Sequence, residues 1–340
     1  MKEISIIDNG RIFSVTSQLK TGNMNDKKRD DTVFLQRKTR WLKRFCIGLS
    51  LFLLFFTAPV YGQVQIESSY MLPSNYRDNT NTATGGKGDF KDIGLFMQIP
   101  VYMKTNELDQ ITAWAIALGG TYASMNNTDL SDDQCLSQIL NSSLGVAHMR
   151  PLNKNWTFTA SLGAGIYTDL SQFSANSIMA QAGTLFIRRM LPSLDLGFGV
   201  ALNNVLGYPM IFPSLYLDWR TGKRFEFKIS LYDTWLASAG MKVNDLFTVR
   251  LLAQAKGMTA VVDRNNESKI FSKQLIIIGL QPELYVNKIF SIPITAGVSV
   301  IREAYFQDRN LRSFFNIEED YPYFAPAFYV SIGLKFFFNK

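Results

Sequence analysis

The chain has 340 residues, 47% of them hydrophobic and 13% aromatic, and its formal net charge is +7. This composition is ample for a hydrophobic core, and the length allows one large domain or two. Residues 1–62 hold 11 Lys and Arg against 5 Asp and Glu, which leaves 24 basic and 23 acidic residues for 63–340. The excess charge is therefore confined to the N-terminal segment, and no basic array with interleaved aromatic residues indicates nucleic acid as a partner.

The N-terminal segment has the organisation of a secretory signal. Basic RKTRWLKR (37–44) precedes an apolar run of 14 residues, FCIGLSLFLLFFTA (45–58), and small residues lead to Gly62. This run is shorter than the ~20 residues that cross a bilayer as a helix, so 37–62 is predicted to be a cleaved signal peptide. Residues 1–36 are polar and without periodicity, and they are predicted to be disordered or not translated.

Residues 63–340 show a period of two in hydrophobicity. In WTFTASLGAGIYTD (156–169) apolar side chains alternate with small or polar ones, and FEFKISLYD (225–233) repeats the pattern with Glu and Lys. Many of these segments match the 9–11 residues that a tilted strand needs to cross a membrane. In chain order the predicted strands are 64–73, 91–103, 111–124, 138–149, 156–168, 174–189, 195–205, 210–220, 225–235, 236–243, 247–261, 272–286, 289–303 and 325–338.

The connections between these strands alternate in length. Short turns such as RTGKR (220–224) and NK (287–288) would lie on one side, and polar, often longer connections such as 73–90 and 302–324 on the other. An even strand number with short turns on one side is typical of bacterial outer-membrane barrels. The sequence therefore predicts an all-β fold, a closed antiparallel transmembrane β-barrel of about fourteen strands. Without the weakly patterned first strand and the corner at 235/236, the number would be twelve.

PLNKNWTFTASLGAGIYTDL (151–170), the aromatic C-terminal strand and the leader together resemble uncharacterised outer-membrane β-barrel families of Gram-negative bacteria with a porin-like architecture. The resemblance covers 63–340 and implies integral insertion in the outer membrane, contact with its lipid and lipopolysaccharide, and insertion by the barrel-assembly machinery. Such families usually end on an aromatic residue, whereas here Asn339 and Lys340 follow Phe338. The resemblance is one of architecture and assigns no functional residues.

Alternation also separates a lipid face from a lumen face. The predicted lumen-lining residues are Gln98, Tyr216, Asp218, Arg220, Glu226, Lys228, Arg250, Gln254, Lys256, Gln281, Glu283, Glu303 and Lys335. Their charges can tune the selectivity of a hydrophilic pore, or they can pair and plug a narrow barrel. Fourteen strands lie between the eight of filled barrels and the sixteen to eighteen of open channels, so both alternatives remain.

Little in the sequence points to catalysis. His148 is the single histidine, and no nearby motif supplies the nucleophile and orienting carboxylate that a histidine base requires. With Cys46 removed with the leader, Cys135 alone remains, which excludes an internal disulfide. One His and one Cys are too few for a zinc site of the usual type. We therefore expect a protein that is not an enzyme, without metal or cofactor. The predicted function is a passive pore for small solutes; the alternative is a closed structural barrel whose outer loops bind a partner protein or surface glycan.

Overall fold

The structure is a computed structural model that describes residues 62–338, except 132, 172, 174, 205–208, 223, 233, 265–266 and 310–320. Gly62, where the signal peptide is predicted to end, opens the first strand. The remainder of the predicted leader, 37–61, and the segment 1–36 lie outside the described residues. Cleavage of the leader therefore stays a prediction.

The described residues form seventeen strands, of which fourteen build the wall of a barrel and three are short outer extensions. The fourteen-strand prediction is confirmed. The wall strands are β1 (Gly62–Arg77), β2 (Ala83–Thr105), β3 (Ile111–Ser124), β5 (Gln138–Pro151), β6 (Trp156–Thr168), β7 (Ile178–Leu191), β8 (Leu194–Asn203), β9 (Met210–Thr221), β10 (Phe225–Leu231), β11 (Trp235–Asn244), β12 (Phe247–Arg264), β13 (Glu267–Tyr285), β14 (Phe290–Ile301) and β17 (Ala327–Phe338).

The wall is closed and antiparallel throughout. Consecutive wall strands pair with one another, and the last strand, β17, pairs with β1 from Gly62↔Phe338 to Met71↔Tyr329. Because the first and last strands meet, each of the fourteen described wall strands has a partner strand on both sides, and the sheet closes without an edge in this part of the chain. One boundary differs from the sequence prediction, which places the turn between two strands at 235/236. β10 ends at Leu231 and β11 begins at Trp235, so the turn lies between these two residues. Trp235 pairs with Leu231 on β10 and with Ala255 on β12, so it belongs to the strand and not to the turn.

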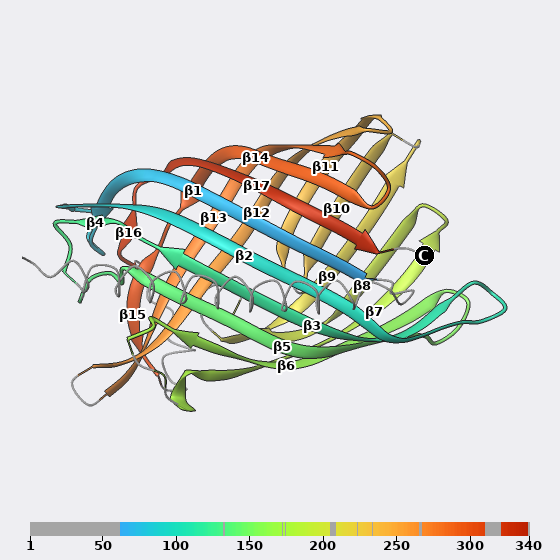
Figure 1. The fold of residues 1–340 in the computed structure, drawn as a ribbon, viewed down its shortest axis with the longest axis horizontal. Helices are drawn as coiled ribbons and strands as arrows, with labels where there is room; N and C mark the ends of the chain where they lie inside the picture. The colour runs from blue at the N-terminus through green and yellow to red at the C-terminus, as the bar shows by residue number, and fades with distance from the viewer. Residues whose placement is uncertain are drawn as a thin grey trace, which may run out of the picture. The chain divides into compact units, whose positions relative to one another are not determined.

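Three short strands extend the wall at the end away from the C-terminus (Figure 1). They are β4 (Asn127–Thr128), β15 (Ala304–Asp308) and β16 (Tyr323–Phe324), which pair with β2, β13 and β1 respectively. We call this the outer end, because the longer connections lie here and both ends of the described chain lie opposite. Among the described residues, no helix is long and apolar enough to cross a membrane.

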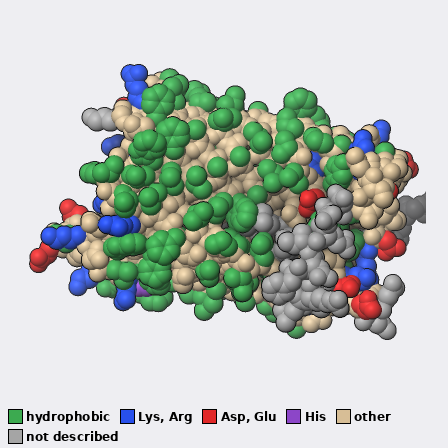
Figure 2. All heavy atoms as spheres, turned by 180° about the vertical axis from the view of Figure 1, so that it is seen from behind, with side chains coloured by type: hydrophobic (Ala, Val, Ile, Leu, Met, Phe, Trp, Pro, Cys, Tyr) green, Lys and Arg blue, Asp and Glu red, His purple; other side chains and the backbone are tan. Residues whose placement is uncertain are grey.

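The outward face of the wall is apolar. Leu162, Phe198 and Leu280 are 63%, 58% and 54% exposed although they lie in the interior of strands. Figure 2 shows hydrophobic side chains over the middle of the barrel, with Lys, Arg, Asp and Glu gathered at its two ends. A closed sheet satisfies its own backbone hydrogen bonds, so this surface can face acyl chains without cost to the backbone. The strands therefore span a membrane as a β-barrel, and the apolar face of each strand points to the lipid.

The interior of the outer end is filled by a hydrophobic cluster. It joins side chains of β1, β2, β12 and β13 to residues of the outer connections, and Phe90, Ile139, Phe271 and Phe324 are at most 2% exposed. Tyr76 packs on Phe324 with the ring centroids 5.0 Å apart. The outer end is thus packed like a protein core, whereas the part of the lumen below it is not.

Candidate functional site

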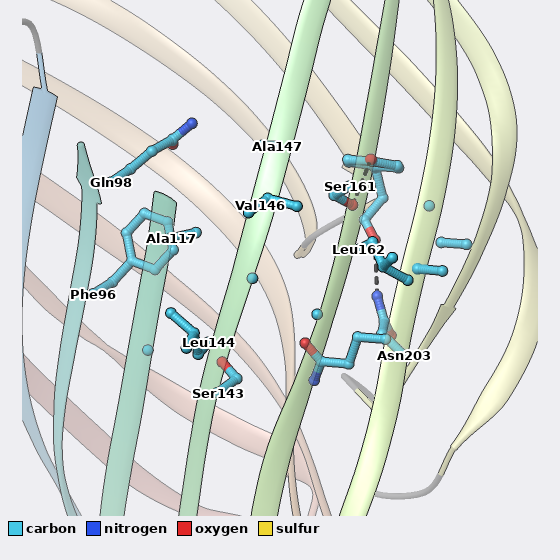
Figure 3. A pocket seen from close by; sticks show the side chains of 18 of the residues that line it. Phe96, Gln98, Ala117, Ser143, Leu144, Val146, Ala147, Ser161, Leu162 and Asn203 are labelled. Carbon is cyan, nitrogen blue, oxygen red and sulfur yellow. Dashed lines mark hydrogen bonds between the residues drawn. The ribbon is translucent and has the colours of Figure 1, made fainter. Parts of the chain in front are cut away.

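The lumen contains a cavity of about 770 Å³ against the wall formed by β2, β3 and β5 to β10. Inward-facing amide and hydroxyl side chains line it, and Figure 3 shows Gln98, Ser143, Ser161 and Asn203 around this space. The cavity exists because many inward positions on these strands are small. Gly119, Gly145, Gly163 and Gly183 lie on its wall, where a side chain would occupy the space.

Gly145 and Gly163 also show why small residues are required at these positions. They are Cα partners on β5 and β6. A Cβ on Gly163 would lie 2.7 Å from the carbonyl oxygen of Leu144 and 3.0 Å from the Cα of Gly145, closer than side chains pack. The glycines therefore allow β5 and β6 to approach each other on the lumen side, and no side chain projects into the cavity at these two positions.

Hydrogen bonds that cross the lumen close the cavity towards the outer end. Asn141 on β5 donates through Nδ2 to the carbonyl oxygen of Thr259 on β12, at 3.1 Å, and Asn204 donates to the hydroxyl of Thr259 at 3.4 Å. Going round the barrel in one direction, β6, β7, β8, β9, β10 and β11 separate β5 from β12. In the other direction β3, β2, β1, β17, β14 and β13 separate them, so the two strands lie opposite each other. We call the Asn141–Thr259–Asn204 contact the cross-lumen contact.

Two further bonds support this constriction. The hydroxyl of Tyr232, in the connection between β10 and β11, lies 2.9 Å from Ser161 Oγ on β6. Asn203 on β8 donates to the carbonyl oxygen of Tyr232 at 2.9 Å. Tyr232 therefore bridges strands that are not neighbours in the wall. Above it, Tyr167, Met179, Val261 and Ile270 form a small buried cluster.

The opposite wall carries paired charges. Arg250 contacts Glu226 at 2.5 Å (Nε to Oε1) and is also paired with Glu283. Lys335 lies 3.3 Å from Glu283, and Ser291 donates to the same carboxylate at 2.7 Å. Two carboxylates and two cations thus form one neutral network across β10, β12, β13 and β17.

A second pair lies further along the same wall. Lys256 Nζ is 2.5 Å from Glu67 Oε1 and 3.1 Å from the hydroxyl of Tyr329. Asp92 on β2 accepts a hydrogen bond from Ser69. Glu67 and Asp92 were not among the predicted lumen residues, because the first strand is weakly patterned and the apolar positions of 91–103 do not alternate cleanly.

The remaining predicted lumen residues are placed as follows. Asp218 and Arg220 pair with each other at 3.0 Å, and Arg220 is 62% exposed. Gln281 donates to Thr295 at 3.0 Å, next to the charged network. Gln98, Tyr216 and Lys228 line the cavity. Gln254 is half-buried on β12, between Arg250 and Lys256 on the same face.

Glu303 is placed differently from the sequence expectation. Ser299 on β14 pairs with Ile277 on β13, and the next pair is Ile301 with Ile276. Two residues of β14 thus correspond to one residue of β13, which marks a bulge. A bulge adds one residue and exchanges the two faces of a strand. Beyond it Arg302 lies on the inner face and is fully buried, whereas Glu303 bridges Tyr323 through its backbone. Strict alternation, which assigned Glu303 to the lumen, cannot detect this exchange.

Two basic side chains are buried in the outer cluster around Phe324. Lys273 Nζ lies 4.1 Å from the ring centroid and the Arg302 guanidinium carbon 5.3 Å from it. Arg302 donates through Nη1 to Ser74 and to the carbonyl oxygen of Ala325, so it ties the end of β14 to β1 and β17. Burial lowers the pKa of Arg302 to about 10, which still leaves it protonated at neutral pH.

The two residues considered for chemistry lie apart. His148 stacks on Trp114 with ring centroids 4.2 Å apart, on the lipid-facing side near the turns, and its Nδ1 is 3.1 Å from the carbonyl oxygen of Ala113. Cys135 is buried in the outer cluster, and burial raises the pKa of its thiol. Among the described residues, no three His, Cys, Asp or Glu side chains gather as a metal site requires.

These features define the protein as a transmembrane β-barrel of the outer-membrane type: a closed antiparallel wall with an apolar outer face, short turns at one end and a polar lumen. The chain belongs to the family described as Domain of unknown function (DUF6268), whose model matches residues 58–337. No curated protein matches the chain.

Several solved structures are similar to this barrel at low identity. The KdgM porin in complex with disordered oligogalacturonate is 5% identical, with 81% of this chain and 99% of that chain covered and a TM-score of 0.32. An outer membrane channel from Pseudomonas putida F1 is 9% identical, with 82% and 96% covered and a TM-score of 0.43. A Pseudomonas aeruginosa FadL homologue is 10% identical, with 83% and 91% covered and a TM-score of 0.40.

Proposed function

We propose that this barrel is a pore for small hydrophilic solutes, and that the cross-lumen contact and the hydrophobic cluster above it together restrict passage at its outer end. The proposal rests on the cavity of about 770 Å³ with its amide and hydroxyl lining. A barrel that serves only as a rigid anchor has no need of an interior volume lined by glycine and polar side chains, because side chains can fill a small barrel completely.

Pairing of the charges on the opposite wall is compatible with this role. Arg250, Glu226, Glu283 and Lys335 neutralise each other on one side of the lumen and leave the cavity on the other side. The charges therefore need not plug the barrel in order to be satisfied. In this arrangement they stiffen one wall, and solutes pass along the other.

The alternative, docking of a partner by the outer aromatic residues, has less support. Tyr305 and Phe324 are 4% and 2% exposed, and both pack inside the outer end of the barrel. Their rings are thus occupied by the protein's own core and are not presented to a partner.

Liposome swelling tests the proposal. Proteoliposomes that contain the barrel should swell faster than protein-free liposomes in arabinose, and more slowly in the larger raffinose. Asn141→Ala removes the donor of the cross-lumen contact, so it should accelerate swelling severalfold. Leu140→Ala changes the next residue, on the lipid face of the same strand, and serves as the matched control. Swelling no faster than in protein-free liposomes, for the wild type and Asn141→Ala alike, would contradict the pore.

A further inference from the structure

The cavity is lined by a single charged side chain among the described residues, that of Lys228 on β10. All other described lining groups are apolar, amide, hydroxyl or glycine. Lys228 is exposed to the lumen rather than packed into the wall. A lone cation in a cavity of otherwise neutral groups sets the sign of the charge that the cavity accepts.

The carboxylates next to Lys228 are already paired. Asp218 is the Cα partner of Lys228 on β9. Its carboxylate accepts two hydrogen bonds from Arg220, one from Nε at 3.0 Å and one from Nη2 at 3.3 Å. Glu226, two residues away on the same face, is paired with Arg250 at 2.5 Å. Within the described residues the Lys228 ammonium has no ion pair or hydrogen bond. It is therefore available to an anion that enters the lumen.

Neutral hydrogen-bonding groups in the cavity are available in the same way. Gln98, Ser143 and Thr159 line it and make no side-chain hydrogen bond within the described residues. Gln98 lies on β2 and Ser143 on β5, with β3 between them (Figure 3), whereas Ser161 and Asn203 are engaged by Tyr232. Hydroxyls and amides both donate and accept, so they suit a solute that carries several hydroxyl groups.

From these observations we infer that the cavity binds a small polyhydroxylated monocarboxylate, such as a sugar acid. The carboxylate would lie on Lys228, and the hydroxyls on the amide and hydroxyl side chains of the same cavity, among them Thr159. A second negative charge would find no free cation among the described lining residues, which favours a single acidic group. The volume falls within the range of about 300–1,000 Å³ that is usual for small-molecule sites. The inference rests on the proposed function and names its solute class.

Calorimetric titration of the full-length protein in detergent tests this inference without any flow across a membrane. Gluconate combines one carboxylate with several hydroxyls, glucose supplies hydroxyls alone, and acetate supplies charge alone. Gluconate should bind at least about tenfold more tightly than either, because a charge-assisted hydrogen bond and neutral hydrogen bonds act together.

Lys228→Gln should weaken gluconate binding about tenfold and leave glucose unchanged, because it removes a charged partner but keeps a polar side chain. Lys242→Gln is the matched control, since Lys242 near the end of β11 pairs with Asp245 in the following turn and does not line the cavity, and it should bind gluconate like the wild type. Equal affinity for gluconate and glucose, equal affinity for gluconate and acetate, no binding at all, or insensitivity to Lys228→Gln would each overturn the inference. Failure of the pore would instead appear as absent swelling with gluconate binding intact.

Discussion

Glu283 illustrates how a charge is held inside this barrel. Its side chain is 2% exposed and contacts Arg250, Lys335 and Ser291. Taking an ion out of water costs several kcal/mol, and here two cations and a hydroxyl offset that cost. Sequence alternation alone predicts that Glu283, Arg250 and Lys335 share the lumen face. It does not predict that they meet, because the three lie on different strands whose relative register depends on the whole barrel.

Glu283→Gln should therefore destabilise the folded barrel, because it leaves Lys335 and one side of Arg250 without a carboxylate. The expected loss is about 3 kcal/mol in the free energy of unfolding. Urea unfolding in lipid vesicles, followed by tryptophan fluorescence, measures it. Asp245→Asn breaks an exposed pair in a turn and should leave the unfolding midpoint unchanged. Equal midpoints for Glu283→Gln and the wild type would show that the network contributes no stability.

At the level of the strands, period two was sufficient to locate the wall. Strands 111–124 and 156–168 have the predicted bounds, because their alternation is uninterrupted from turn to turn. β14 shows where the method fails. Its bulge beyond Ser299 exchanges the faces, so Arg302 takes the buried inner position that alternation assigns to Glu303. The sequence does not reveal this extra residue, because Arg302 and Glu303 are both charged and either could be assigned to the inner face.

Close strand packing at glycine pairs gives a further testable prediction. Gly279 and Gly297 are partners on β13 and β14, and a Cβ on Gly297 would clash with the carbonyl oxygen of Ile278. Gly297→Ala should destabilise the barrel by about 1–3 kcal/mol, because the backbone of β13 must move. Gly120→Ala is the control, since its nearest atom is 3.9 Å away. Heat-modifiability on gels and urea midpoints measure both variants, and equal midpoints would contradict the close contact.

For the molecule as a whole, the central feature is the contrast between a cavity on one side of the lumen and a closed outer end. The cavity follows from small inward residues that are visible in the sequence, such as Gly163 and Ser161. The closure does not, because Asn141 and Thr259 are 118 residues apart and meet only when opposite walls approach. Local patterns carry no information about such a contact.

Single-channel conductance in a planar bilayer tests this account most directly. With the cross-lumen contact as the restriction, the wild type should remain mostly closed and open briefly. Asn141→Ala should raise the open fraction, and Leu140→Ala should behave like the wild type. A wild-type barrel that is permanently open, with the same conductance as Asn141→Ala, would show that the contact between β5 and β12 does not restrict the lumen.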